Sequence, residues 1–89
     1  MEIDFDPIKN DKNIRERGID FAMVLDFEWS SAVYEVDNRK NYGETRWQAT
    51  GFIGSRLYRL VYKDIPNGIR VISFRKANKR EVKKYVSDH

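Results

Sequence analysis

The chain has 89 residues, of which 40% are hydrophobic, 35% charged and 13% aromatic. This balance is typical of an ordered globular protein and not of a disordered tail, so we expect residues 1–89 to form one domain. The sequence contains no cysteine, and its only histidine is His89. It therefore excludes a disulfide scaffold, a thiolate metal site and a catalytic centre built around histidine.

The N-terminus lacks the features of an export signal. Residues 1–8 carry three acidic side chains and have neither the cationic start nor the apolar run that secretion requires. No apolar stretch approaches the roughly 20 residues of a membrane span. We therefore expect a cytoplasmic protein.

The net charge of +3 hides an asymmetry along the chain. Residues 1–38 hold 4 basic and 10 acidic side chains, a net charge of −6, whereas residues 39–89 hold 13 basic and 4 acidic side chains, a net charge of +9. A segment this basic is suited to a polyanion such as RNA or DNA, because each phosphate contact releases condensed counterions. The alternative is that the two parts neutralise each other in the folded protein.

Three helices are predicted, each from a local start signal. The first begins at Asp6-Pro7, because Asp caps a helix N-terminus and Pro fits the first turn. It ends at Gly18, because Gly tolerates the left-handed conformation of a C-terminal cap. Asp20 begins a second helix, and Asn78 with Glu81 forms a capping box that begins the last.

Between these helices the pattern changes to short runs rich in strand-forming residues. Strands are predicted at 32–36, 44–53, 57–63 and 69–75, separated by polar or Gly-containing turns. Gly51, inside the second strand, indicates a bulge or a close backbone approach. The predicted fold is α+β: two N-terminal helices, a four-stranded antiparallel sheet and a C-terminal helix, with the helices on one face of the sheet.

The reactive side chains that remain are Arg, Lys, Glu, Asp, Tyr and Ser, without a nucleophile motif or a phosphate loop. RNA cleavage fits this inventory, because RNA supplies its own nucleophile, the 2′-hydroxyl. Arg46 and Arg75 lie near predicted strand ends and could each present a planar donor fork to phosphate. Arg59 and Arg70 are further candidates, and any of these arginines could instead serve only solubility.

Spacing relates some of these residues to one another. Arg70 and Arg75 are an odd number of residues apart, so they point to opposite faces of a regular strand. They share a site only if the strand ends or bulges between them, and we therefore prefer Arg75 as the phosphate-binding residue. Glu44 and Arg46 project on the same side, either as a general base beside its charge clamp or as an ion pair without chemistry. Lys9, Asn13 and Arg17 share one helix face, which by itself is an ordinary solvated face.

The last helix carries a basic ridge opposite its apolar face. The ridge consists of Lys79, Arg80, Lys83 and Lys84. It could face RNA or could simply be a solvated surface.

Taken together, these residues resemble the BrnT family of toxins. The motif pieces are Asp6-x-x-Lys9-x-x-x-Asn13-x-x-x-Arg17-Gly18-x-x-Phe21, then Gly43-Glu44-x-Arg46 with Gly51, then Arg70-x-Ile72-Ser73-x-Arg75-x-Ala77, then Glu81 and Tyr85. The resemblance covers the chain from Phe5 to about Tyr85. It implies a RelE-like fold and a ribonuclease of a type II toxin–antitoxin system that cuts RNA without a metal or other cofactor and slows translation and growth.

The same resemblance implies partners and site residues. The partners are RNA and a BrnA-type antitoxin, a ribbon-helix-helix DNA binder, in a hetero-oligomer. The catalytic candidates are Lys9, Arg17, Glu44, Arg46 and Arg75, with Asn13, Ser73 and Ala77 as structural residues. The candidates for RNA binding are Arg59, Arg70, Lys76, Lys79, Arg80 and Lys83.

One position departs from the family pattern. The family commonly has Lys-His-Gly where this chain has Glu16-Arg17-Gly18. An arginine cannot act as a base near neutral pH, so proton transfer is left to Glu44, Lys9 or water. An inactive relative that binds only nucleic acid or its antitoxin, or a structural subunit with self-neutralising charge, therefore remains as an alternative to a ribonuclease.

Overall fold

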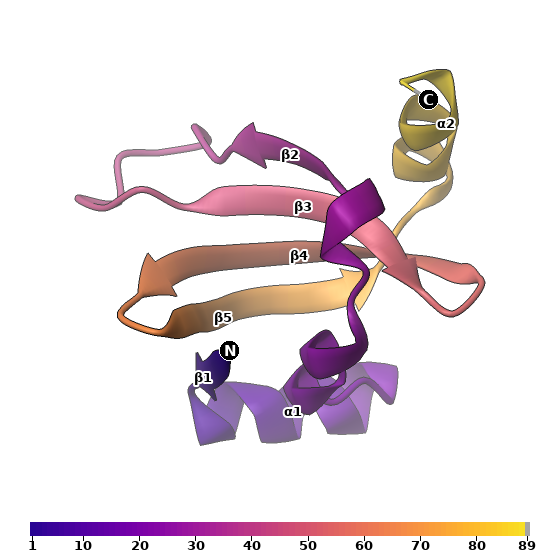
Figure 1. Cartoon of the computed structure of the whole chain (residues 1–89). Coiled ribbons are helices and arrows are strands. Elements are labelled where there is room, and N and C mark those ends of the chain that lie inside the picture. The colour runs from indigo at the N-terminus through magenta and orange to yellow at the C-terminus, as the bar shows by residue number, and fades with distance from the viewer. Residues whose placement is uncertain (89) are drawn as a thin grey trace.

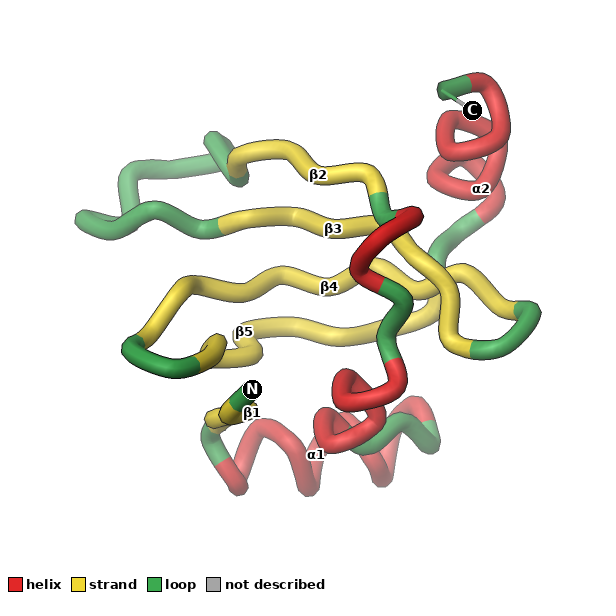
Figure 2. Tube along the Cα trace, viewed as in Figure 1, coloured by secondary structure: helices red, strands yellow, loops and turns green. Residues whose placement is uncertain are grey.

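The structure, a computed structural model, describes residues 1–88 and consists of one sheet with helical segments on both of its faces (Figure 1). Its elements in chain order are β1 (Glu2–Phe5), α1 (Pro7–Arg17), the 3-10 segments η1 (Phe21–Asp26) and η2 (Trp29–Ser31), β2 (Val33–Val36), β3 (Trp47–Ile53), β4 (Arg56–Ile65), β5 (Gly68–Lys76) and α2 (Lys79–Ser87). Figure 2 shows the two 3-10 segments in red, with η1 next to α1 and η2 in front of the yellow strands.

The sheet has five strands in the order β1-β5-β4-β3-β2. Strands β2 to β5 form the predicted antiparallel meander, but β1 adds a parallel pair with β5, from Glu2 opposite Gly68 to Phe5 opposite Val71. The prediction of a four-stranded, wholly antiparallel sheet is therefore wrong. The missed strand is only four residues long, and its partner lies more than 60 positions away, so no local pattern reveals the pairing.

Local signals at both ends of α1 are confirmed. The Asp6 side chain accepts a hydrogen bond from the backbone N–H of Ile8 at 2.9 Å, Pro7 opens the helix, and Gly18 ends it with φ of 69°. The predicted capping box of α2 is also present, because Asn78 and Glu81 each accept a hydrogen bond from the other's backbone N–H.

The second predicted helix is a short 3-10 segment instead. Asp20 caps it as predicted, accepting from the N–H of Ala22 at 2.9 Å. The buried residues Phe21, Val24 and Phe27 then recur every three positions, which is the period of a 3-10 helix and not of an α-helix. The tighter winding aims all three side chains at the sheet, so the prediction of two N-terminal α-helices is wrong.

The main core fills the space between these segments and one face of the sheet. Ile19, Phe21, Val24 and Phe27 pack there against side chains of the three central strands, including the fully buried Leu60 and Phe74. Gly51 permits this packing because a Cβ at its position would lie 2.6 Å from Cζ of Phe27. Of the two features expected at this glycine, the bulge is absent, because β3 pairs with β4 there in regular register, and the close approach is made by side chains of Phe27 and Ala32 and not by another backbone segment.

Helix α2 lies on the opposite face of the sheet. Tyr85 is buried with Leu57 and Ala77 in a second, smaller cluster to which Phe52 and Val33 also belong. Phe52 and Leu57 alternate with the main-core residues along β3 and β4, so they project from the other side, and Val33 pairs with Thr50 of the same side. The helices are therefore not grouped on one face as predicted, because Phe52 and Leu57 provide an apolar seat at the end of an otherwise polar face.

Candidate nucleic-acid interface

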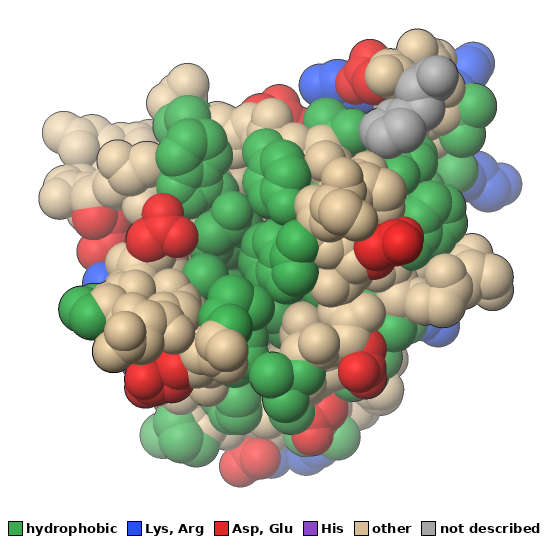
Figure 3. All heavy atoms as spheres, in the orientation of Figure 1, with side chains coloured by type: hydrophobic (Ala, Val, Ile, Leu, Met, Phe, Trp, Pro, Cys, Tyr) green, Lys and Arg blue, Asp and Glu red, His purple; other side chains and the backbone are tan. Residues whose placement is uncertain are grey.

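The face of the sheet that carries α2 is polar over most of its area. Arg59 on β4 pairs with Arg75 on β5 and with Thr50 on β3, so the three side chains form a row across the strands. Helix α2 adds Glu81 at one end of this row. The other face is different, since Figure 3 shows mainly hydrophobic side chains over its middle.

Glu81 holds the Arg75 guanidinium in a two-pronged ion pair. Nη1 and Nη2 of Arg75 donate to Oε1 and Oε2 of Glu81 at 2.7 and 2.9 Å. Arg75 is the main cause that lowers the pKa of Glu81 to about 2, and Glu81 in turn raises the pKa of Arg75. In the described part of the chain, the Nε–H of Arg75 donates to no protein acceptor, and the side chain is 34% exposed.

Arg59 is held more completely than Arg75. It donates to the Thr50 hydroxyl at 2.7 Å, to Glu35 at 3.1 Å and to the Gln48 side chain, and its Nε lies 3.6 Å from Glu81 Oε2. Its side chain is only 16% exposed. Arg59 therefore fixes the centre of the polar face and contributes positive charge to it.

A bulge in β5 decides which arginines share this face. Val61 pairs with Ser73 and Tyr62 with Val71, so Ile72 is an extra residue in β5. As a result Arg70 and Arg75 point to the same side of the sheet, although they are an odd number of residues apart. Arg70 lies opposite Lys63 and Arg75 lies opposite Arg59. Arg70 forms an ion pair with Asp4 of β1, whereas Arg75 reaches α2.

The loop between β2 and β3 presents another arginine to the same face. Nε and Nη2 of Arg39 each donate to a carboxylate oxygen of Asp37 at 2.7 Å, and the Tyr42 hydroxyl donates to Asp37 at 3.1 Å. The Asp37 carboxylate is fully buried, and hydrogen bonding by Arg39 holds its pKa well below the usual range. Arg39 is itself 64% exposed, so an interior carboxylate anchors a guanidinium that reaches solvent.

Helix α1 supplies the other side of the interface. Asn13 is buried and donates from Nδ2 to the carbonyl oxygens of Ile19 and Phe74, both at 2.9 Å, which fixes α1 beside β5. Its Oδ1 accepts from Nη1 of Arg17 at 3.3 Å. With the helix held in this way, Lys9, Lys12 and Arg17 line one hollow with Ser73 and Arg39.

Three hollows lie between α2 and α1 along this face and share lining residues, and we call them together the basic groove. Their volumes, in order from α2 to α1, are about 250, 220 and 440 Å³. The first and second hollows share Arg59 and Glu81, and the second and third share Arg39 and Ser73. The cations of the basic groove are Lys9, Lys12, Arg17, Arg39, Arg59, Arg75, Arg80 and Lys84, and its carboxylates are Glu16, Glu35, Glu81 and Asp88. Cations outnumber carboxylates in it, so this basic groove suits a chain of phosphates.

Residues 5–81, which supply most of the basic groove, match a known protein family. The matching family model describes BrnT, the ribonuclease toxin of type II toxin–antitoxin systems. The chain belongs to the BrnT family. No match was found among the curated proteins. Family membership confirms the resemblance seen in the sequence, and it makes RNA the target of the family and a protein antitoxin its partner.

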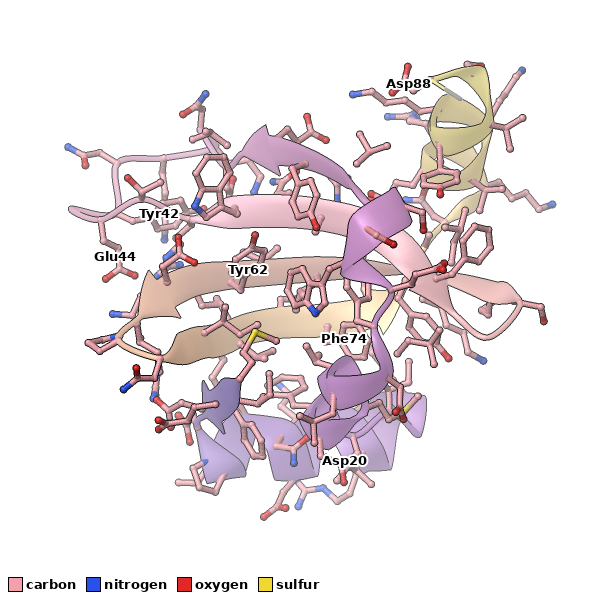
Figure 4. All side chains as sticks on the ribbon, viewed as in Figure 1. Asp20, Tyr42, Glu44, Tyr62, Phe74 and Asp88 are labelled. Carbon is pink, nitrogen blue, oxygen red and sulfur yellow. The ribbon has the colours of Figure 1, made fainter. Side chains whose placement is uncertain are left out.

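Within this BrnT fold the predicted catalytic residues fall into two groups. Arg75, Lys9 and Arg17 line the basic groove. Glu44 and Arg46 lie instead around a separate hollow in the loop before β3. Figure 4 shows Glu44 and Tyr42 at the end of the sheet opposite Asp88, the residue that follows α2.

The predicted contact between Glu44 and Arg46 is present, although β3 begins only at Trp47, so both residues lie in the preceding loop and not in the predicted strand. Nε of Arg46 donates to Glu44 at 3.1 Å, Lys63 donates to the same carboxylate at 3.2 Å, and the Arg46 guanidinium stacks 4.0 Å from the Tyr42 ring centre. Hydrogen bonding, first from Lys63 and then from Arg46, lowers the pKa of Glu44. A carboxylate with a lowered pKa is a weaker base, so this geometry favours the ion pair over the general base.

The predicted RNA-binding residues are more scattered than expected. Arg59 and Arg80 line the basic groove, and Arg70 lies on the same face in its ion pair with Asp4. Lys76 pairs with the core residue Tyr58, which places its side chain on the other face from Arg75. Lys79 and Lys83 lie on a different side of α2.

Arg39, Lys12 and Glu81 also line the groove, although the sequence pattern does not predict a site role for them. Arg39 lies in a polar turn, and only the burial of Asp37, which no local pattern shows, makes it a fixed part of the face. Glu81 was noted for its capping box, and its second contact, with Arg75, depends on where α2 packs. Lys12 could have been found by its helical spacing, because it lies three positions after Lys9 on the same face.

Neither a metal centre nor a membrane span is found in the part of the chain that the structure describes. Within residues 1–88, no three side chains of His, Cys, Asp or Glu gather in a way that could hold a metal ion. No described helix has the length and apolar character needed to cross a bilayer.

Proposed function

We propose that the chain cleaves RNA in the cytoplasm without a metal ion, using the basic groove to bind the strand and Arg75 to stabilise the reacting phosphate. One observation carries this proposal: Arg75 of β5, Arg39 of the loop before β3 and Lys9 of α1 line two hollows that share Ser73. Guanidinium groups match the charge and shape of a phosphate whose negative charge grows during reaction.

In the proposed reaction the 2′-oxygen of one nucleotide attacks the adjacent phosphorus and displaces the 5′-oxygen of the next. The products are a 2′,3′-cyclic phosphate on the 5′ fragment and a 5′-hydroxyl on the 3′ fragment. A base accepts the proton of the 2′-hydroxyl, and the leaving oxygen gains one. Lys9 or water fits proton transfer better than Glu44, because Lys9 lines the groove and Glu44 does not.

The experiment is cleavage of end-labelled RNA by purified protein in EDTA, which removes contaminating metal-dependent nucleases. We expect Arg75→Ala to lower the cleavage rate by about 100-fold or more, the usual cost of removing a donor that stabilises a transition state. Arg15→Ala is the matched control, since Arg15 is an exposed arginine of α1 outside the groove-lining residues. Cleavage by Arg75→Ala at the wild-type rate would contradict the proposal.

A second candidate function is RNA or antitoxin binding without cleavage, and the ion pair between Glu81 and Arg75 favours it because that carboxylate already occupies the guanidinium fork. The two functions differ in a growth assay. A ribonuclease toxin arrests growth when expressed without its antitoxin, whereas a soluble binding module leaves growth unchanged.

We further propose that the protein antitoxin is of the BrnA type and binds as part of a hetero-oligomer. A stable complex of this kind buries on the order of 1,600 Å² or more in total. Co-expression followed by size-exclusion chromatography tests this partner, because a toxin that elutes alone beside a soluble BrnA-type protein contradicts the assignment.

A further inference from the structure

A second groove lies on the flank of α2 that faces away from the basic groove. It has a volume of about 610 Å³, and most of its lining residues come from α2, from the adjoining ends of β3 and β4 and from the turn between these strands. Figure 1 shows α2 and this turn on the right. Its apolar lining includes Phe52, Leu57, Val82 and Val86, and its cations are Arg56, Lys79 and Lys83. Within residues 1–88, no Asp or Glu lines this apolar groove.

Helix α2 separates the two grooves by its own periodicity. Val82 and Val86 are four residues apart, as are Lys79 and Lys83, so these pairs form one stripe that lines the apolar groove. Arg80 and Lys84 lie on the side that lines the basic groove. The basic ridge predicted from the sequence is therefore divided between two different surfaces.

The apolar stripe is incompletely covered by the protein itself. Val86 is 66% exposed although it lies one turn from the half-buried Val82. Figure 3 shows hydrophobic side chains beside Lys and Arg side chains along this flank of the molecule. An apolar floor with a rim of cations is the complement of an amphipathic segment that carries acidic residues.

The lining favours a protein segment over RNA. Single-stranded RNA is bound through stacking on exposed aromatic faces together with phosphate contacts. The Phe52 ring already packs edge-on against Tyr85, with ring centres 5.5 Å apart, and the rest of the floor is aliphatic. Such a floor accepts leucine-like or valine-like side chains.

We propose that the apolar groove docks an acidic amphipathic segment of the antitoxin. This inference rests on the proposed function, because the partner is the protein that neutralises the toxin. A nine-residue helix such as α2 is about 13 Å long, which matches two to three turns of a partner helix laid beside it. The segment places its apolar residues on Val82 and Val86 and its carboxylates opposite Lys79, Lys83 and Arg56.

The test uses peptides of about 15 residues that tile the cognate antitoxin, titrated against the full toxin chain by fluorescence anisotropy. We expect an acidic amphipathic peptide to bind, and Val86→Asp and Lys83→Glu each to weaken it by about 10-fold or more. Arg80→Glu, a matched charge reversal on the other side of the same helix, should change the affinity by less than about 2-fold. Retained RNA cleavage by Val86→Asp shows that this variant is folded.

A charge swap makes the test specific. Replacing an acidic residue of the binding peptide by Lys should restore affinity for Lys83→Glu while weakening binding to the wild type. If intact antitoxin binds the wild type and both groove variants equally, the docking proposal is overturned and the toxin function stands. If the variants lose RNA binding but keep antitoxin binding, the groove belongs to RNA and the docking proposal is also overturned. If no antitoxin binds the wild type, the antitoxin part of the proposed function itself fails.

Discussion

Glu81 links the stability of α2 to the geometry of the candidate site. One of its carboxylate oxygens accepts from the N–H of Asn78 and from Arg75, while the other accepts from Arg75 alone and lies near Arg59. The side chain is 16% exposed, so these contacts are only partly screened by water. A single carboxylate therefore begins a helix and orients the arginine that we place on the reacting phosphate.

We expect Glu81→Gln to lower the free energy of unfolding at pH 7 by about 1 to 3 kcal/mol, because it loses charge-assisted hydrogen bonds. The folded-state pKa of Glu81, about 2, lies below its ordinary value of 4.5, so its stabilisation is complete above pH 5 and is lost as the pH falls towards 2. The difference in the free energy of unfolding between Glu81→Gln and the wild type should therefore become smaller as the pH falls from 5 towards 2. Urea denaturation followed by tryptophan fluorescence at pH 7, 5 and 3 measures it.

Glu16→Gln is the control for this experiment, since Glu16 is exposed and forms no ion pair with another residue of the described chain. It should change stability by less than about 0.5 kcal/mol at every pH. A loss for Glu81→Gln that is as large at pH 3 as at pH 7 would show that its ion pair is not the cause.

At the scale of elements, strand β1 depends on a glycine in its neighbour. Gly68 of β5 pairs with Glu2, and a Cβ at position 68 would lie 1.9 Å from the backbone oxygen of Glu2. We expect Gly68→Ala to push β1 away from β5 and to expose Ile3 and Phe5, which pack against the main core. Hydrogen exchange of the β1 amides should become about 10-fold faster or more, relative to the amides of β4.

Gly18→Ala serves as the comparison for this prediction. Gly18 has φ of 69° with open space around it, so alanine there strains the helix end by about 1 kcal/mol without touching β1. Its effect on exchange should not be concentrated in β1. Equal protection of β1 in Gly68→Ala and in the wild type would contradict the proposed dependence.

The elements that could be predicted from the sequence are those specified by neighbouring residues. The caps at Asp6, Gly18 and Asn78 and the four meander strands each follow from a few adjacent positions. Strand β1 could not be predicted because its pairing is long-range, and η1 was assigned the wrong helix type because its burial period becomes clear only against the sheet. Arg70 shows the same limit, since the bulge at Ile72 reverses the face that its spacing implies.

The candidate site could be predicted only in part for the same reason. Arg75 was selected because it ends a strand, and the structure places it in the basic groove. Arg39 was missed because its position depends on the buried Asp37, and Lys83 was assigned to RNA because a ridge on a helix does not reveal which side packs on the sheet. The catalytic and RNA-binding roles remain predictions that the variants above test.

At the scale of the whole molecule, the acidic and basic parts of the sequence meet without cancelling. Ion pairs join Asp4 to Arg70, Glu35 to Arg59 and Asp37 to Arg39, each linking the first 38 residues to the remainder. The acidic and basic parts of the chain therefore neutralise each other at these three ion pairs. The basic groove nevertheless keeps an excess of cations, because α1 contributes Lys9, Lys12 and Arg17 to it from the acidic part of the chain.

This excess predicts strongly salt-dependent RNA binding. With about four to six phosphates contacted, the slope of log K against log salt concentration is about −3 to −4 for a single strand, so affinity should fall roughly 50-fold or more between 50 and 200 mM salt. The probe is an oligonucleotide of the RNA sequence with 2′-deoxy sugars, which lacks the nucleophile and cannot be cut by the proposed reaction. Lys9→Ala/Lys12→Ala removes two cations and should make the slope about 1.4 units shallower, whereas Arg15→Ala should leave it unchanged. Absence of affinity even at 50 mM salt would mean that the ion pairs between the two parts of the chain neutralise the groove, and that RNA is not bound there.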